Sequence, residues 1–333
     1  MTSIGRRSYL VNYFKEALTG RGKVIAANSI ADTPGMLAAD EAVAVPPIAD
    51  ENYGNIILDL CTKYKVGLLC PFFDLDLAAL APLKKQFESL GVRAAISSPE
   101  VVNICFDKWE TVKFARQNGI ATPLTYATID SALNALSQGE INYPVIVKPR
   151  WGTGSIGVTT AYDRQDLEGV FYHTQLVLKN SYLAGTIKDD APPSSIIIQE
   201  KVSGKEFGVD VVNDLDDNYI CTFAKKKIAM RSGETDAAIT IDDNEMTQIA
   251  AVIGKNLQHT GLLDVDIIKT EKQAYLIEMN PRFGGHYPFA HLAGANIPAA
   301  LIAWAQGSAP NPEWLQAETG IRGYKDLVPK TVN

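Results

Sequence analysis

The first 105 residues alternate short apolar runs with stretches of helical spacing. Residues 23–29 and 65–73 are apolar runs typical of strands, and residues 77–91 carry apolar side chains at helical intervals before Gly91. Strands separated by helices indicate a parallel sheet with helices on its faces. We therefore predict that the chain opens with an α/β domain.

The pattern changes in the second half, where the strands become longer and alternate apolar with polar positions. A helix pair over 97–123 separates the halves, and an apolar strand at 143–149 begins a second sheet-forming region. From Ser195 onward, alternating strands are followed by a helix at 244–260 and by a hairpin over 263–280. This order predicts an α+β region after the α/β domain.

Composition and charge narrow the class of protein. The chain has 333 residues, which is enough for about two or three domains. Its 31 basic and 38 acidic residues give a net charge of −7, so it is a poor general binder of nucleic acid. The negative net charge does not exclude binding of a small anion such as a nucleotide, because one local pocket is enough to bind it. No strand of the first half is followed by GxGxxG, the fingerprint of dinucleotide-binding folds. The P-loop fingerprint GxxxxGK[ST] occurs nowhere in the sequence.

Membrane and secretory segments are not expected. No apolar run approaches the ~20 residues of a membrane span, and the N-terminal stretch MTSIGRRSYLVNYF lacks the long apolar core of a secretory signal. The four cysteines are scattered without a CxxC pair, which argues against zinc-ribbon or thioredoxin chemistry. We therefore expect a cytoplasmic protein without a membrane partner.

The hairpin over 263–280 carries the clearest chemical signal. Residues i and i+2 of a strand share a face, so we expect Glu278 and Asn280 to point one way and Ile277 and Met279 to point into the core. A carboxylate and an amide on an open face indicate a ligand site. A solvated hairpin face is the alternative.

The partner strand of this hairpin adds further oxygen ligands. Asp264 and Asp266 share one face, and a carboxylate from each strand with an amide oxygen would suit Mg²⁺. The strand period alone does not choose between the two aspartates. Arg282 follows the second strand and leaves a cation close to this cluster.

Two further segments have features of a nucleotide site. A strand delivers Lys148 to a loop that carries Gly152, Gly154, Ser155 and Gly157; glycine lets backbone N–H groups approach a phosphate, and lysine supplies a point charge. The apolar strand at 196–199 ends at Glu200–Lys201–Val202, and a new strand begins at Glu206. The alternative for the glycine loop is a plain turn, and the alternative for the segment around Glu200 and Glu206 is an ordinary hairpin. One or two lysines of the run 225–227 would face the ligand of this site or the glycine loop, unless the run is solvated.

The three signals in this order resemble the ATP-grasp superfamily, and within it the branch similar to the carbamoyl phosphate synthase large subunit. The resemblance covers about residues 3 to 307. It is carried by SIGRRSYLV, DKWETVKFARQNGIATP and IEMNPRFGGHYPFAHLAGANIP, at 3–11, 107–123 and 277–298. The last stretch is the most specific.

The resemblance implies a fold and its division. An N-terminal pre-ATP-grasp α/β domain with a parallel sheet would span 1–107. A two-lobed ATP-grasp fold would follow, with one lobe at 108–194, a second at 195–307 and a C-terminal tail at 308–333. The first strand of the N-terminal domain would precede TSIGRR, so either that strand is missing or the true start lies upstream.

The resemblance also implies which residues hold ATP. Lys108 and Lys148 would contact its phosphates from two sides, and the loop 151–157 would close over them as a lid. Glu200, Lys201 and Val202 would approach the adenine edge, and Glu206 would bind the ribose hydroxyls. The lid residues are Gly152, Gly154, Ser155 and Gly157.

Metal and substrate residues are implied in the same way. Asp266, Glu278 and Asn280 would hold Mg²⁺, with Glu278 bridging two ions and Mn²⁺ able to substitute. Arg282 would steady the phosphoryl group or the acyl phosphate. Arg231 is a candidate for a substrate carboxylate unless it is simply solvated, and His286 is expected in the core or beside the substrate.

The function implied is a ligase that uses ATP to join a carboxylate to an amine and releases ADP and phosphate. Its partners would be small molecules, and a homodimer is compatible with the resemblance. Two alternatives stay open: a subunit that forms carbamoyl or carboxy phosphate with a partner chain, and a nucleotide-binding regulatory protein. The chain is far too short for a complete two-halved carbamoyl phosphate synthetase and shows no glutaminase Cys-His arrangement.

Overall fold

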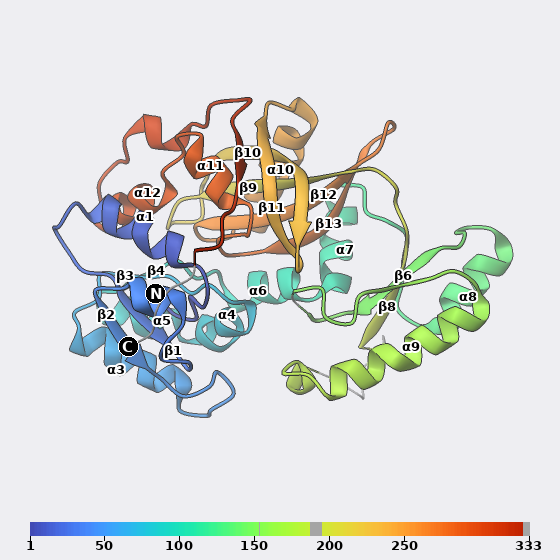
Figure 1. Ribbon diagram of the computed structural model, residues 1–333, viewed down its shortest axis with the longest axis horizontal. Helices are drawn as coiled ribbons and strands as arrows, with labels where there is room; N and C mark the ends of the chain where they lie inside the picture. Colours follow the sequence, from blue (N-terminus) through green and yellow to red (C-terminus); the bar gives the residue numbers. More distant parts are fainter. Residues whose placement is uncertain (153, 187–194, 329–333) are drawn as a thin grey trace.

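The computed structural model describes residues 1–152, 154–186 and 195–328. Two short parallel strand pairs form the centre of the N-terminal domain (Figure 1): β1 (Ile25–Asn28) with β2 (Glu41–Ala44), and β3 (Leu68–Leu69) with β4 (Arg93–Ala94). Thr2 joins the pairs because it bridges in parallel to both Ala27 and Pro71. Thr2, which the resemblance places after the first strand, thus lies between the two strand pairs.

Helices cover this small sheet, as the alternating pattern predicts. They are α1 (Ser8–Leu18), α2 (Pro34–Ala38), α3 (Tyr53–Lys63), α4 (Asp74–Leu80) and α5 (Lys84–Ser89). The single helix predicted over 77–91 is wrong in detail. A 3₁₀ turn at Ala81–Leu83 separates α4 from α5, and Pro82 in that turn has no N–H for an α-helical hydrogen bond.

The helix pair predicted over 97–123 is confirmed by α6 (Pro99–Phe106) and α7 (Lys108–Gln117). Side-chain caps explain why two helices form: Ser98 accepts from the N–H of Val101, and Asp107 accepts from the N–H of Trp109. The cap at Asp107 ends one helix and begins the next, and so fixes Lys108 at the first position of α7.

A four-stranded antiparallel sheet follows, in the order β5-β8-β6-β7. Its strands are β5 (Thr125–Tyr126), β6 (Val145–Pro149), β7 (Thr159–Ala161) and β8 (Ile196–Glu200), accompanied by α8 (Ile129–Gln138), α9 (Arg164–Lys179) and a 3₁₀ turn (Ala184–Thr186). This lobe, with α8 and α9, projects to the right in Figure 1.

The second lobe contains a six-stranded antiparallel sheet in the order β13-β12-β9-β10-β11-β14. Its strands are β9 (Lys205–Asn213), β10 (Tyr219–Arg231), β11 (Glu234–Ile241), β12 (Leu262–Lys269), β13 (Ala274–Asn280) and β14 (Arg322–Tyr324). Helix α10 (Asn244–Leu257) packs on β9 and β10 and shares their apolar core. The remaining elements are α11 (Tyr287–Leu292), α12 (Ile297–Ala305), which packs against α1, and a 3₁₀ turn (Pro312–Leu315).

Strand pairing places two segments differently from the division expected from the sequence. β8 starts within the expected part 195–307, but it pairs with β6 of the smaller sheet because Ile196 and Ile198 are buried with Val145 and Val147. β14 lies within the expected tail, yet it pairs with β11 and extends the larger sheet. Among the described residues, no helix is long and apolar enough to cross a membrane.

Candidate active site

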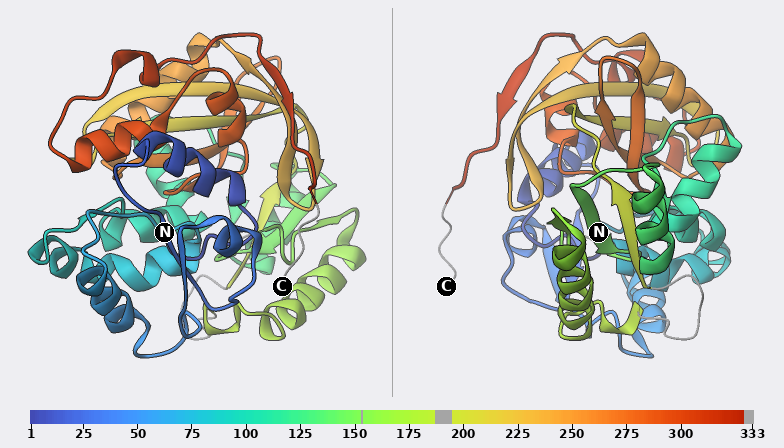
Figure 2. Two further views of the ribbon diagram at one scale, coloured as in Figure 1. Left: turned by 60° about the vertical axis from the view of Figure 1, so that its left-hand side comes forward. Right: turned by 90° about the vertical axis from the view of Figure 1, so that its right-hand side faces the viewer.

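A cavity of about 380 Å³ lies between the two sheets of the two lobes. In the right-hand view of Figure 2 the smaller sheet lies beneath the larger one. The cavity gathers most of the residues expected from the sequence: Lys108, Lys148, Gly152, Gly154, Ser155, Glu200, Lys201, Val202, Glu206, Asp266 and Glu278. The other expected residues lie outside its lining, namely Gly157, Arg231, Asn280, Arg282 and His286.

Two buried ammonium groups face this cavity. Lys108 Nζ donates to the carbonyl oxygen of Gly152 at 2.9 Å and lies 3.6 Å from Oε1 of Glu278. Lys148 Nζ donates to Oε1 of Gln199 at 2.8 Å. Burial, and next the positive charge of Lys108, lowers the pKa of Lys148 to about 8, while Glu278 acts in the opposite direction. An anion in the cavity would stabilise the charged form of Lys148.

The glycine loop turns sharply beside these lysines. Gly154, Ser155 and Gly157 all have positive φ, at 64°, 60° and 69°, which is the left-handed region that glycine adopts at no steric cost. Gly157 does not line the cavity; it lies against Pro149, since a Cβ at this position would be 3.1 Å from Cγ of Pro149. Thr153, within the expected lid, lies outside the described residues.

The opposite end of the cavity is formed where β8 ends. Glu200 Oε2 accepts a hydrogen bond from the N–H of Leu124 at 3.1 Å, which ties this strand end to β5. Lys201 and Val202 continue the cavity wall beyond it, and Glu206 enters from β9. The strand end therefore offers both backbone groups and a carboxylate to a ligand.

The β12–β13 hairpin brings one acidic residue from each strand face to face. Asp266 pairs with Glu278 across the hairpin, and both line the cavity. The expectation that Ile277 points into the core is wrong. The register shifts after Asp266, so that Leu276 enters the core and Ile277 lines the cavity next to Glu278. A bulge of this kind interrupts the two-residue alternation on which the prediction depended.

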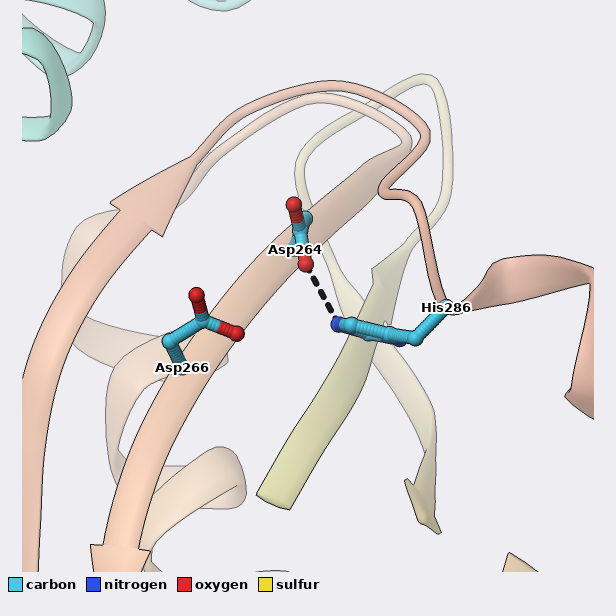
Figure 3. Close-up of side chains that lie close together, drawn as sticks. All are labelled: Asp264, Asp266 and His286. Carbon is cyan, nitrogen blue, oxygen red and sulfur yellow. Dashed lines mark ion pairs between the residues drawn. The ribbon is translucent and has the colours of Figure 1, made fainter. Parts of the chain in front are cut away.

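Asp264, the other aspartate of β12, belongs to a buried charge network instead of the cavity wall. Both imidazole nitrogens of His286 contact carboxylates: Nδ1 lies 3.2 Å from Oδ1 of Asp210, and Nε2 contacts Oδ1 of Asp264 (Figure 3). Asp210 is also paired with the buried ammonium of Lys225. Burial and Lys225 lower the pKa of His286, but Asp264 and Asp210 outweigh them and leave it raised.

This network helps to identify a metal site. Ligand atoms of Asp264, Asp266 and His286 lie within 4.8 Å of one another, yet both nitrogens of His286 already contact carboxylates. Asp266 and Glu278 remain as hard oxygen donors on facing positions, which is the donor type that Mg²⁺ prefers. In this structure each has a lysine partner: Lys227 Nζ donates to Asp266 at 2.6 Å, and Lys108 approaches Glu278. Because Asp266 and Glu278 offer oxygen donors at facing positions, the residues present fit a magnesium site.

Asn280, the third expected ligand, lies one residue pair further along the hairpin. It pairs with Asp264 and is 9% exposed. It therefore lies next to the facing carboxylates on the same strand as Glu278, at the edge of the site.

Arg282 is held from two directions. Its guanidinium makes a bidentate pair with Asp74 of α4, with Nε–Oδ1 and Nη2–Oδ2 at 2.8 and 3.0 Å, and Nη1 lies 3.3 Å from Oδ2 of Asp264. The N-terminal domain thus supplies a buried carboxylate to the end of the metal hairpin. Arg231, by contrast, is 41% exposed in its side chain and pairs with Asp236.

Sequence reasoning missed several members of this site. Asp74 gave no motif signal, since its partner is 208 residues away. Asp210 was detectable, because a lone carboxylate in the apolar strand GVDVV must find a partner when buried. Lys227 fulfils the expectation that one lysine of its run faces the cavity, while Lys225 is fully buried on the same side of β10.

Comparison with known proteins shows which domain families the chain contains. The PylC-like N-terminal domain matches residues 1–95, and the ATP-grasp domain matches residues 105–286. The chain is 26% identical over 232 residues to the carbamoyl phosphate synthase large chain of Campylobacter jejuni, which covers 67% of this chain and 20% of that protein. The chain therefore spans about a fifth of the length of this relative.

Solved structures show the same fold. The biotin carboxylase domain of 2-oxoglutarate carboxylase from Hydrogenobacter thermophilus, determined with MgADP, ADP and bicarbonate, superposes with a TM-score of 0.73 at 18% identity, covering 93% of this chain and 70% of that one. L-amino acid ligase from Bacillus licheniformis gives a TM-score of 0.66 at 18% identity, covering 94% and 76%. The resemblance predicted from the sequence is confirmed: this chain belongs to the ATP-grasp family.

Proposed function

We propose that this protein is an ATP- and Mg²⁺-dependent ligase that joins a carboxylate to an amine through an acyl phosphate and releases ADP and phosphate. The observation that carries the proposal is the cavity in which Lys108, Lys148 and the glycine loop face the paired carboxylates Asp266 and Glu278. Among its structural neighbours is an L-amino acid ligase, and among its sequence relatives are carbamoyl phosphate synthase large chains.

The nucleotide would lie along the cavity. The strand end at Glu200–Val202 would receive the adenine edge, and Glu206 would accept bonds from the ribose hydroxyls. Lys108 and Lys148 would bind phosphate oxygens at the other end, beneath Gly152, Gly154 and Ser155. Two buried cations with few competing water molecules favour a polyanion strongly.

Asp266, Glu278 and Asn280 would hold Mg²⁺, with Glu278 shared between two ions and Mn²⁺ able to replace them. When bound, the metal would neutralise phosphate charge. Side chains of the protein must also rearrange. Lys108 and Lys227 now pair with Glu278 and Asp266, and they must exchange these carboxylates for phosphate oxygens or solvent as the nucleotide enters.

The reaction needs no protein nucleophile. An oxygen of the substrate carboxylate attacks the γ-phosphorus and ADP departs. The neutral amine nitrogen then attacks the acyl carbon, the bond from that carbon to the phosphate oxygen breaks, and phosphate departs with the proton that the nitrogen loses. The protein contributes positioning and positive charge. Arg282, fixed by Asp74 and Asp264, is a rigid cation beside the metal hairpin and would steady the acyl phosphate.

The substrates are small molecules, and the scattered cysteines favour a cytoplasmic location. The Hydrogenobacter domain was solved as a dimer, which makes a homodimer the assembly to test. Arg231 remains a candidate for a substrate carboxylate at the tip of the β10–β11 hairpin, provided that Asp236 releases it.

The test is ADP and phosphate release from MgATP with a panel of carboxylates, amines, amino acids and bicarbonate. Release that requires both a carboxylate and an amine supports the proposal, whereas AMP and pyrophosphate would refute the acyl-phosphate route. Glu278→Gln should abolish turnover. Glu271→Gln, in the exposed turn of the same hairpin, is the matched control and should leave turnover unchanged. Release with bicarbonate alone would favour the carboxyphosphate alternative, and binding without turnover would favour a regulatory protein.

A further inference from the structure

Three charged side chains outside the nucleotide cavity meet beside it. Arg7 precedes α1, Glu234 begins β11 and Lys325 follows β14. Arg7 Nη2 lies 3.6 Å from Oε1 of Glu234, and Lys325 Nζ lies 3.4 Å from Oε2 of the same residue. Two cations from opposite ends of the chain thus flank one carboxylate.

This cluster is adjacent to the reacting end of the cavity. Gly233, the residue before Glu234, lines the cavity and faces the glycine loop: a Cβ on Gly233 would lie 3.2 Å from Oγ of Ser155. A Cβ on Gly285 would lie 3.5 Å from the side chain of Glu234 and 3.7 Å from Lys325 Nζ. Gly285 follows Arg282 by three residues, and Arg7 belongs to the N-terminal domain, so the cluster lies where this domain meets the segment that follows the metal hairpin.

The cluster holds more positive than negative charge in a partly buried place. The side chains of Arg7 and Lys325 are 18% and 15% exposed, whereas Glu234 is 37% exposed. Burial raises the pKa of Glu234, but Arg7 and Lys325 outweigh it and keep the carboxyl ionised. The hydroxyl of Tyr9 is buried without a hydrogen-bond partner among the described residues, and Lys325 lies over its ring.

We propose that Arg7, Lys325 and Glu234 bind an amino acid that serves as the amine substrate of the ligase. Arg7 and Lys325 hold its carboxylate, the Tyr9 hydroxyl can donate to it, and Glu234 pairs with its ammonium group, which gives up one proton to solvent before the nitrogen attacks the acyl carbon. This inference rests on the proposed function, because it assigns the substrate class of that reaction.

Geometry distinguishes this carboxylate from the one that reacts. The carboxylate that attacks ATP must lie at the phosphate end, near Arg282 and the metal hairpin. A second carboxylate site on the far side of Gly285 would hold a carboxylate that is not activated. An amine substrate with such a group is an amino acid, and each of its two charges meets an opposite charge in the cluster.

The test measures binding without turnover. Each of the twenty amino acids is titrated into the full chain saturated with MgADP, and the tightest binder is compared with its decarboxylated amine and its deaminated acid. We expect the amino acid to bind at least about tenfold more tightly than either, since each of the two analogues lacks one charged contact that the cluster makes with the amino acid.

Variants assign this preference to the cluster. Arg7→Gln and Lys325→Gln should each weaken amino-acid binding about tenfold or more and reduce the preference over the decarboxylated amine, and Glu234→Gln should reduce the preference over the deaminated acid. Lys85→Gln, on the exposed face of α5, is the control. Unchanged MgADP affinity would show that each variant is folded.

Two results would overturn the inference: no amino acid binds the wild-type protein, or the variants bind it as the wild type does. Each of these two binding results is compatible with ADP release that requires a carboxylate and a simple amine, and in that case the proposed function stands. Conversely, amino-acid binding that depends on Arg7, without any ADP release across the panel, would refute the ligase and leave the binding site.

Discussion

The protonation of Lys148 provides a quantitative test of the nucleotide site. Its pKa is lowered to about 8 by burial and by Lys108. With that value the free protein carries a protonated Lys148 in about 0.9 of molecules at pH 7 and about 0.1 at pH 9. A bound triphosphate stabilises the ammonium form and raises this pKa, so binding at high pH must recruit a proton.

We therefore expect MgATP binding to take up about 0.1 proton per site at pH 7 and about 0.9 at pH 9. The affinity should also fall about tenfold for each unit above pH 8, because a growing share of the protein must first be protonated. Calorimetry with a non-hydrolysable ATP analogue, in buffers of different ionisation enthalpy, gives the number of protons directly.

Lys148→Arg is the matched control. A guanidinium stays charged at these pH values, so this variant should lose the proton uptake at pH 9 while keeping a cation at the phosphate position. The difference between the two proteins isolates Lys148 from other titrating groups. Equal uptake by wild type and variant at pH 9 would refute the reasoning.

The same pKa has a defined effect on the stability of the free protein. The unfolded chain, with an ordinary lysine pKa of 10.5, binds more protons than the folded chain between pH 8 and 10.5. The contribution of Lys148 to the free energy of unfolding therefore rises with pH across this window and is lost as pH falls through 8. Denaturant titrations of wild type and Lys148→Arg across this range would show the difference.

Three further predictions concern burial, close contact and charge competition. Asp74→Asn removes the carboxylate of a buried arginine pair between the N-terminal domain and the larger lobe, and should lower the free energy of unfolding by about 3 kcal/mol. Asp216→Asn breaks another pair between these parts, with Arg93, but the Asp216 side chain is 71% exposed, so this change should cost under about 0.5 kcal/mol; equal losses in urea denaturation would contradict this. Gly208→Ala should cost about 1–3 kcal/mol because the added Cβ would overlap the imidazole ring of His286. Gly169→Ala, which adds a methyl group in open space within α9, should stabilise the protein by up to about 1 kcal/mol; thermal denaturation compares the two. Lys227→Met should raise the affinity for Mn²⁺ without nucleotide, measured by electron paramagnetic resonance, because the ammonium that pairs with the metal carboxylate is gone; weaker binding would argue against a metal at this position.

The hairpin shows how far the sequence could be interpreted. Its i, i+2 spacing correctly indicated acidic residues on facing strands, because pleating is a local property of the backbone. The choice of Asp266 over Asp264 required the family resemblance, and the bulge that turns Ile277 into the cavity gave no sequence signal. Bulges arise from how three strands share one twisted surface, which pairwise alternation does not encode.

Long-range pairing was beyond the sequence for a different reason. β8 looked like the first strand of the second lobe because it precedes β9 in the chain, yet the apolar faces of Ile196 and Ile198 are buried by the smaller lobe. Likewise, the sequence around Asp74 does not indicate its partner, because the buried charge of Asp74 is compensated by Arg282, which comes from another domain. Such partners become visible only when the fold brings distant segments together.

The cations of the site differ in what a ligand must displace. Lys108, Lys227 and Arg282 each have a carboxylate partner within the protein, so an incoming phosphate or carboxylate replaces one negative charge by another. Lys148 donates instead to the neutral amide of Gln199, and its buried charge is therefore poorly compensated, as its lowered pKa shows. A phosphate oxygen gains most where the existing partner is neutral. On this argument Lys148, of the four cations, contributes most to nucleotide affinity, and replacing it with methionine should weaken MgATP binding more than the same change at Lys227.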